Sequence, residues 1–425
     1  PLLGPSTPAR LIRTGLVLVL GCLIAGSITL ADALTRQSAL DDTGQRAVAL
    51  SVDAAELYHS LADADAMATS GYVAGGVEPA AVRARYDRDL AGAADTLARA
   101  AGELGQDAPE HRWVTTVAAQ LPMYSGMIET ARFYNRQGLP LGQTYLTTAS
   151  ALLRDTVLPA VDRLRDPGQA RLLAGDGEAV GPARFAVLLV GVPLLVLLVG
   201  VSVRERHRTN RVLNPGLVVA GVLLAVALGW WAVATTVAGI KLGEAARQST
   251  AMTALDDARA AVLRARSNES LVLVARSGGK ASDDGFTAQL TRVIGADDRG
   301  GLLALASPEV RPDGLGRSPL VDAVRAETRH YAGAHRALRA ADDGGDYRAA
   351  VASATGADPD GSGAAFERLD DALRRAIAAP RAALSADVEA ARTALGGLAG
   401  GPAVLTLLAA VAAAVGIAVR VREYS

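Results

Sequence analysis

Residues 184–203 read RFAVLLVGVPLLVLLVGVSV, residues 204–211 read RERHRTNR, and residues 212–240 read VLNPGLVVAGVLLAVALGWWAVATTVAGI. No charged side chain occurs in 185–203 or in 212–240. Each segment is long enough to cross a bilayer, because the hydrocarbon core requires about 20 apolar residues of helix. The sequence therefore predicts a hairpin of two membrane-spanning helices joined by a short basic loop.

The charge of this loop predicts its side of the membrane. It carries four arginines, Arg204, Arg206, Arg208 and Arg211, against the single acid Glu205. Short loops rich in arginine are retained in the cytoplasm. We therefore expect the long segments on either side of the hairpin to lie outside the cytoplasm.

The composition agrees with a membrane protein that also has large polar parts. The chain has 425 residues, of which 50% are hydrophobic and 20% are charged. Two more apolar stretches, 14–31 and 397–419, raise the number of predicted spans to four. The expected fold class is an all-α membrane protein with four transmembrane helices and two tandem extracytoplasmic helical-bundle sensor domains.

The predicted topology is that of a multi-pass plasma-membrane protein with both termini in the cytoplasm. Its order is a tail (1–13), span 1 (14–31), extracytoplasmic domain 1 (32–181), span 2 (184–203), the basic loop (204–211), span 3 (212–240), extracytoplasmic domain 2 (241–396), span 4 (397–419) and a tail (420–425). The first span is either a retained anchor or a cleaved secretory signal, since Ala31-Asp32-Ala33 resembles a cleavage site. Either alternative leaves domain 1 outside.

Apolar residues between the spans follow a helical period. Leu50, Ala54, Leu57, Leu61, Ala64 and Ala68 recur at alternating steps of four and three, which indicates the seam of a long packed helix. We expect such helices to continue almost without interruption from the first and third spans. Further helices are expected at 79–104, 110–137 and 142–172, with Gly75 and Gly76 ending the first helix and Pro159 kinking the last.

The second half of the chain repeats this plan. Gly278-Gly279 corresponds to Gly75-Gly76, Tyr331-Ala332-Gly333 to Tyr124-Ser125-Gly126, and Pro380 to Pro159. The matches occur in the same order in both halves, which indicates an internal repeat of span, helical bundle and span.

The motifs of common enzyme classes are absent from the sequence. It has no P-loop, no dinucleotide-binding glycine motif, no HExxH and no nucleophile elbow. The five histidines are scattered, and we expect His330 and His335 to lie on the surface. The segments outside the spans are not basic enough to suggest nucleic-acid binding. These observations favour a protein that is not an enzyme and that needs no cofactor and no metal.

Polar residues at seam positions are the candidate contacts for a ligand or partner outside the cell. Extending the seam of the second half places Glu269 in the core, where it must be paired; Arg266 and Arg276 are close enough along the helix. Glu269 then either binds the ammonium group of a ligand or closes an internal salt bridge. Asp63 and Asp65 occupy the corresponding region of the first half, and Tyr124 and Tyr331 either line a shared interface or pack against the long helix.

Arginines are also the candidate docking residues on the cytoplasmic side. Arg204, Arg206, Arg208, Arg211, Arg420 and Arg422 form a basic set that could meet an acidic partner. The alternative is that they only determine topology and contact anionic lipid. The short loop and tails cannot form a kinase or cyclase domain, so any signal must pass to a separate protein.

The layout resembles that of the actinobacterial GlnX membrane proteins, and stretches such as ARQSTAMTALDD (246–257) and SNESLVLVARSGG (267–279) support the resemblance. It implies a sensor relay for glutamate, aspartate or a related amino acid. The implied partners are an extracytoplasmic amino-acid-binding lipoprotein and the cytosolic serine/threonine kinase protein kinase G, with homo-oligomerisation left open. The competing hypotheses are a membrane subunit of a solute permease and an envelope structural or assembly factor.

Overall fold

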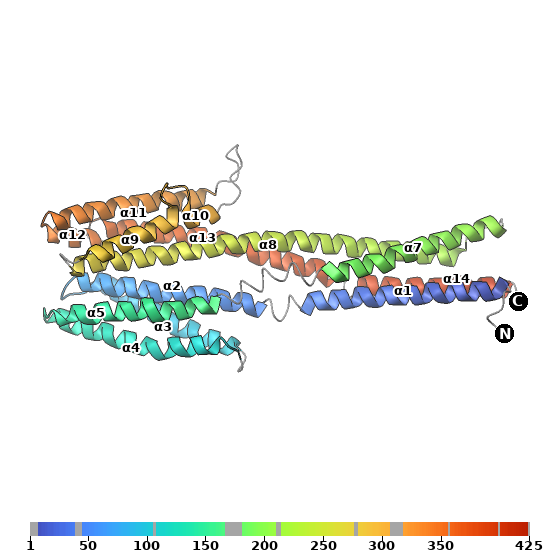
Figure 1. The fold of residues 1–425 in the computed structure, drawn as a ribbon, viewed down its shortest axis with the longest axis horizontal. Helices are drawn as coiled ribbons and strands as arrows, with labels where there is room; N and C mark the ends of the chain where they lie inside the picture. Colours follow the sequence, from blue (N-terminus) through green and yellow to red (C-terminus); the bar gives the residue numbers. More distant parts are fainter. Residues whose placement is uncertain are drawn as a thin grey trace. The chain divides into compact units, whose positions relative to one another are not determined.

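The computed structural model describes residues 7–38, 45–104, 108–165, 181–209, 214–275, 279–306, 318–355, 358–397 and 400–423. The regular elements in these ranges are helices (Figure 1). They are α1 (Thr7–Ser38), α2 (Gln45–Val73), α3 (Ala80–Glu103), α4 (His111–Arg136), α5 (Leu141–Leu152), the π-helical turn η2 (Leu153–Val157), α7 (Gly181–Thr209), α8 (Pro215–Ala275), α9 (Lys280–Ile294), α10 (Gly301–Leu305), α11 (Pro319–Asp343), α12 (Tyr347–Ala354), α13 (Ser362–Gly396) and α14 (Gly401–Glu423).

Four of these helices are long and apolar enough to cross a bilayer. The apolar segments are Ile12–Leu34 in α1, Phe185–Val203 in α7, the first part of α8, and Gly401–Val419 in α14. The number of these helices agrees with the four predicted spans. The chain is an all-α membrane protein.

The chain divides into two compact units, which we describe separately. The membrane unit comprises Pro1–Gln45, Arg171–Ala245 and Ser385–Ser425, and the paired-bundle unit comprises Arg46–Ala170 and Ala246–Leu384. Both α8 and α13 contribute several residues to each unit.

Small residues allow close helix packing in the membrane unit. α1 packs against α7 and α14. Where α8 meets α14, a Cβ atom added to Gly216 would lie 2.5 Å from the Cα of Gly416, and Asn214 donates a hydrogen bond to the Gly416 carbonyl at 2.8 Å. Small residues and side-chain hydrogen bonds of this kind hold helices together in membranes, where the hydrophobic effect does not drive association.

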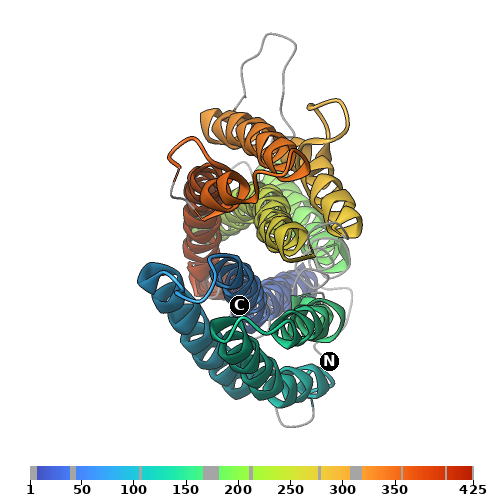
Figure 2. The ribbon, with the colours of Figure 1, turned by 90° about the vertical axis from the view of Figure 1, so that its left-hand side faces the viewer.

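The paired-bundle unit consists of two helical bundles, one from each half of the chain. The first contains α2 to α5, and the second contains the end of α8 with α9 to α13 (Figure 2). One hydrophobic cluster includes side chains of both bundles, among them Leu57 and Leu61 of α2, Val262 of α8 and Leu369 of α13. The two halves therefore share a core.

The helix ends follow the breakers expected from the sequence. α2 ends at Val73, and Gly75 has a φ of +89°, a backbone conformation that glycine adopts without strain. α3 and α4 begin and end within one residue of the predicted limits. The break before the fourth span is also confirmed, since α13 ends at Gly396 and α14 begins at Gly401.

The long helices of the two halves differ at the point where each leaves its span. α8 is a single helix of 61 residues, as predicted for the third span. In the first half, α1 ends at Ser38 and α2 begins at Gln45, and the residues between them lie outside the described ranges. Uninterrupted continuation is therefore observed for the second half only.

Proline alters the last helix of the first bundle by widening one turn. Pro159 lacks the N–H group that an α-helix requires, and its ring crowds the carbonyl one turn earlier. The π-helical turn Leu153–Val157 lies immediately before it, and helical residues continue over 158–165. The expected kink thus takes the form of a π-bulge, a recognised response to a disturbed hydrogen-bond ladder.

Candidate functional site

The candidate site is the polar interface between the two halves of the paired-bundle unit. Its central helices are α2 and the end of α8, which lie side by side (Figure 2). Ser70 and Ser270 form a hydrogen bond at 3.2 Å, and His59 Nε2 lies 3.0 Å from the carbonyl oxygen of Asp256. Contacts between residues about 200 positions apart thus run along much of α2.

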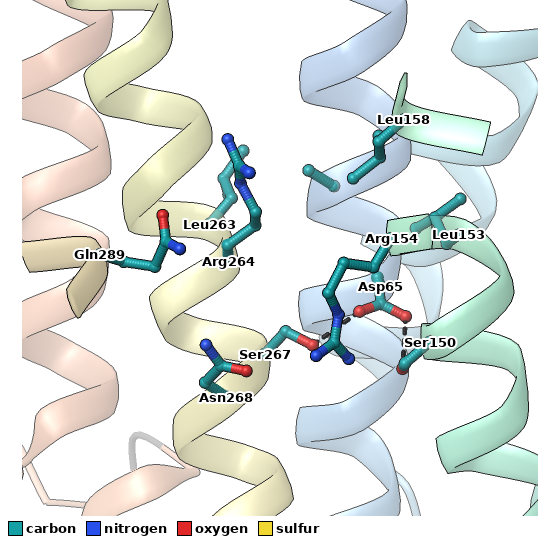
Figure 3. Close-up of a pocket in the computed structure, with 11 residues that line it drawn as sticks. Asp65, Ser150, Leu153, Arg154, Leu158, Leu263, Arg264, Ser267, Asn268 and Gln289 are labelled. Carbon is teal, nitrogen blue, oxygen red and sulfur yellow. Dashed lines mark hydrogen bonds between the residues drawn. The ribbon is translucent and has the colours of Figure 1, made fainter. Parts of the chain in front are cut away.

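Asp65 is the polar centre of the first bundle. Its carboxylate accepts hydrogen bonds from Ser267 of α8 at 2.6 Å and Ser150 of α5 at 2.7 Å (Figure 3). It also accepts one from Tyr124 of α4 at 3.3 Å. Burial raises the pKa of Asp65, and the hydroxyl groups of Ser267 and Ser150 offset part of that rise. Asp65 therefore connects three helices of its own bundle and one of the other.

A small cavity adjoins Asp65 between the bundles. Its volume is about 80 Å³, and it is lined by polar side chains that include Arg154, Arg264 and Gln289 (Figure 3). Since one water occupies about 30 Å³ in the liquid, the cavity has room for a few waters. It is too small for an organic ligand.

Glu269 is the polar centre of the second bundle and is fully buried. Arg266 donates to it at 2.6 Å, Tyr331 at 3.1 Å, and His335 Nδ1 lies 3.0 Å from its other oxygen. Burial acts to raise the pKa of Glu269, but the hydrogen bond from His335 and the charge of Arg266 outweigh it and lower the pKa. The predicted Arg266–Glu269 pairing is present.

His335 was expected on the surface, and this expectation is wrong. Its ring is buried, stacks on Phe286 at 3.6 Å, and places Nε2 2.9 Å from Asp283 Oδ1. Carboxylates only accept hydrogen bonds, so the contacts to Glu269 and Asp283 are both satisfied when both ring nitrogens carry hydrogen. The period of α11 places His335 on the inner face one turn after Tyr331, a signal that the scattered histidine pattern concealed. His330, in contrast, is exposed as predicted.

The two bundles contain the same arrangement built from different acids. In each, a buried tyrosine of an outer helix donates to a buried acid of the central helix: Tyr124 to Asp65, and Tyr331 to Glu269. Both tyrosines are fully buried. Both therefore pack against the central helix of their own bundle, which was one of the two alternatives.

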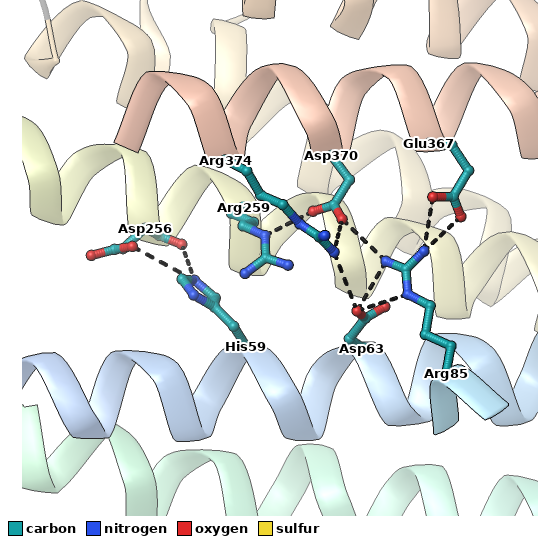
Figure 4. A network of polar contacts seen from close by, with 8 residues as sticks. All are labelled: His59, Asp63, Arg85, Asp256, Arg259, Glu367, Asp370 and Arg374. Carbon is teal, nitrogen blue, oxygen red and sulfur yellow. Dashed lines mark hydrogen bonds and ion pairs between the residues drawn. The ribbon is translucent and has the colours of Figure 1, made fainter. Parts of the chain in front are cut away.

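A network of ion pairs links the bundles beside these centres (Figure 4). Arg85 of α3 lies 2.9 Å from Asp63 of α2, and also 3.1 Å from Asp370 and 2.8 Å from Glu367, both on α13. Asp370 receives further contacts from Arg259 at 2.7 Å and Arg374 at 2.6 Å.

The two buried aspartates of this network have opposite pKa shifts. Burial raises the pKa of Asp63, against the effect of Arg85, and one of its oxygens has no hydrogen-bond partner among the described residues. For Asp370, burial is outweighed by Arg259, which together with Arg374 lowers the pKa. Nearby Asp89 has its pKa raised to about 7 by burial and by the charge of Asp63. The arginines of the network therefore offset the burial of Asp370 fully, but that of Asp63 only in part.

Most members of this network were not identified from the sequence. Asp63 was a candidate, whereas Arg85, Arg259, Glu367, Asp370 and Arg374 were not. A usable signal existed, because Asp370 lies between Phe366 and Leu373 at the same steps of four and three that revealed Glu269. The arginines that meet it come from other helices and have no local pattern.

Of the remaining candidates, those that the structure describes take no part in this site. Arg276 and Arg211 lie outside the described residues. Arg204, Arg206 and Arg208 belong to α7, and Arg420 and Arg422 to α14, where Arg422 is exposed. Among the described residues, no group of three or more His, Cys, Asp or Glu side chains is arranged to hold a metal ion.

Comparison with known proteins gives one family match. Residues 39–175 match the family model described as the actinobacterial sensor domain. This range contains α2 to α5 and hence Asp63, Asp65, Tyr124 and Ser150. No curated protein and no solved structure has significant similarity to the chain.

Proposed function

We propose, from the similarity of residues 39–175 to an actinobacterial sensor domain, that the protein is a non-catalytic transmembrane signal relay. The match supports a signal-sensing role. The finer proposal is that the relay passes the availability of glutamate or aspartate from an extracytoplasmic solute-binding lipoprotein to a cytosolic serine/threonine kinase. Its support is the resemblance in layout to the GlnX membrane proteins.

The observation that carries the relay is the continuity of α8. This helix of 61 residues contains both an apolar segment and the interface residues Ser267 and Ser270, which form hydrogen bonds with Asp65 and Ser70 of α2. A change at the interface that slides or rotates α8 would therefore move residues of the membrane span as well. Small displacements of packed helices are a common means of switching.

Exposed apolar residues at one end of the first bundle support the proposal of a protein partner there. Val77, Phe133, Leu139 and Leu141 are exposed, with Val77 at 88%. The ends of α2 and α4 are connected there, since the Asn135 amide donates to the Tyr72 carbonyl at 2.9 Å. Exposed apolar surface is a common feature of interaction sites. We propose that the lipoprotein docks here.

The cytoplasmic partner would meet the basic set named above. Both termini and the 204–211 loop would lie in the cytoplasm, as the positive-inside rule predicts. The arginines of the loop and of the end of α14 would then face the kinase or an adaptor, and the same residues would contact anionic lipid.

The central experiment measures phosphorylation of the kinase substrates in a deletion strain that expresses the full chain. We expect added glutamate to change phosphorylation with the native chain and not with the empty vector. Affinity capture from membranes should recover the lipoprotein and the kinase. Unchanged phosphorylation together with loss of solute uptake in the deletion strain would contradict the relay and favour the permease hypothesis.

The docking surface has its own test. Replacing Phe133 and Leu141 together by serine should reduce capture of the lipoprotein. Leu305→Ser is the matched control, because Leu305 is similarly exposed (55%) but belongs to the second bundle. Equal capture by the double variant and the control would refute docking at this surface.

A further inference from the structure

Asp32 is the only acidic residue in the apolar segments of α1, α7, α8 (residues 215–240) and α14. It lies near the end of the segment Ile12–Leu34 of α1, and 6% of its surface is exposed. An ionisable side chain within a membrane segment is costly, and such residues are usually paired and functional. We therefore looked for the partner of Asp32 within the membrane unit.

Trp231 of α8 is this partner. Its indole Nε1 donates a hydrogen bond to Asp32 Oδ2 at 3.1 Å, and 2% of the tryptophan surface is exposed. The tryptophan belongs to an apolar cluster that also contains Ala33 of α1, Val187 of α7 and Ala234 of α8. A hydrogen bond in apolar surroundings is electrostatically stronger than the same bond in water. The first and third spans are thus joined by a buried hydrogen bond.

A second polar link of α8 in the membrane unit is more exposed. Lys241 lies 3.2 Å from Asp387 of α13, but its ammonium group also donates to Glu244 at 2.7 Å. The side chains of Lys241 and Asp387 are 35% and 18% exposed. Ion pairs that water can reach contribute little to stability. The buried bond to α1 is therefore the stronger of these two links.

The first half of the chain contacts α8 in both units. In the paired-bundle unit, α2 meets α8 through the hydrogen bonds Asp65–Ser267 and Ser70–Ser270. In the membrane unit, α1 meets it through Asp32 and Trp231. Because α8 is one continuous helix, a displacement that begins at the interface between the bundles also moves Trp231.

We propose that the Asp32–Trp231 hydrogen bond is a latch that makes the first span move together with α8. A rotation or slide of α8 redirects the indole of Trp231. If α1 did not follow, the indole N–H would lose its acceptor in apolar surroundings, which is unfavourable. Movement of both spans together avoids this cost. The inference deepens the proposed relay and rests on it for its physiological meaning.

The first test measures the distance between the two spans in the full chain in lipid nanodiscs. In a Cys22→Ser background, spin labels are attached at Leu16→Cys of α1 and Val233→Cys of α8, both of which are exposed positions. Electron paramagnetic resonance then gives the distribution of distances between the labels. We expect Trp231→Phe, which keeps an aromatic ring but removes the N–H group, to broaden this distribution.

Three controls connect the broadening to the hydrogen bond. Asp32→Asn keeps an acceptor oxygen and should leave the distribution narrow. Trp230→Phe makes the same replacement at the neighbouring position, which is 44% exposed, and should also leave it narrow. Labels at Leu189→Cys of α7 and Val233→Cys should give one distribution in all of these proteins. An unchanged distance between α1 and α8 in both Trp231→Phe and Asp32→Ala would overturn the latch.

The second test measures glutamate-dependent phosphorylation with the same variants. Trp231→Phe and Asp32→Ala should lose most of the response, whereas Asp32→Asn and Trp230→Phe should keep it. A full response in Trp231→Phe, despite a broadened distance distribution, would overturn the role of the latch in signalling and leave the relay intact. Absence of a response with the native chain would instead refute the relay, and the distance measurement would still decide whether the two spans are coupled.

Discussion

At the scale of single residues, the buried acids of the paired-bundle unit differ in how completely they are compensated. Glu269 has Arg266, Tyr331 and His335, whereas Asp65 has hydroxyl groups as its hydrogen-bond donors. An ionised group in the interior is tolerated when it is paired and is costly when its partner is removed. The pairing of Glu269 leads to the first prediction.

Removing one member of the Arg266–Glu269 pair should cost more than removing both. Glu269→Leu leaves the charge of Arg266 buried and should lower the free energy of unfolding by about 3–5 kcal/mol. The double variant Arg266→Met/Glu269→Leu should recover part of that loss. Chemical denaturation of the four proteins of the cycle measures the coupling, and strictly additive losses would contradict it. Asp284→Asn, which removes an exposed pair with Lys280, should change stability little.

Asp89 should make stability depend on pH. Its pKa is raised from 3.8 to about 7 by burial and by Asp63, so the folded state binds the proton more tightly than the unfolded chain does. The stability that it contributes is present below its unfolded pKa and is lost as the pH rises through about 7. Asp89→Asn should therefore be more stable than the native chain at about pH 8, with the difference disappearing in acid.

Thermal unfolding across this pH range measures the effect of Asp89. Asp87→Asn, on the same helix, is the control, because Asp87 is exposed and pairs with Arg83 at 3.1 Å. The pKa of His59 is lowered to about 3 by burial and by Arg259, and this contribution is common to all three proteins. A constant difference between Asp89→Asn and the native chain at every pH would contradict the prediction.

At the scale of elements, α8 and the break between α13 and α14 should respond differently to insertions. Two glycines inserted after Gln248 interrupt the continuous helix, and we expect the phosphorylation response to be lost while the chain still reaches the membrane. The same insertion after Gly397, where the helix has already ended, should leave the response nearly unchanged. The reverse result would show that the signal does not travel along α8.

At the scale of the whole molecule, the topology can be tested by cysteine labelling. Cys22 is the only cysteine of the sequence, so Cys22→Ser provides a clean background. In it, Ala98→Cys and Ala288→Cys introduce thiols at exposed positions of the two bundles, and Thr209→Cys introduces one at the C-terminal end of α7. A membrane-impermeant maleimide should label the first two variants in intact cells. It should label Thr209→Cys only after the cells have been permeabilised. The opposite pattern would refute the proposed orientation.

Local sequence patterns were sufficient to predict the helices and part of the candidate site. The spans, the ends of α3 and α4, and the pairing of Glu269 with Arg266 depend on residues that are close in the sequence. The same reasoning did not predict the burial of His335. The spacing of the histidines in the sequence does not indicate burial, which depends on the inner face of α11. Sequence reasoning also missed Asp370, whose partners Arg85 and Arg259 come from other helices.

The sequence by itself determined the four spans, the helical class and the repeat, because hydrophobic length and period are local properties of a chain. Only the tertiary structure decided which polar groups meet. Ser267 donates to Asp65 across 202 positions, and Arg85 reaches Asp370 across 285. Such contacts depend on the register in which two bundles pack, and a helical period does not specify that register. The interface between the halves, with its cavity beside Asp65, therefore appears only when the chain is folded.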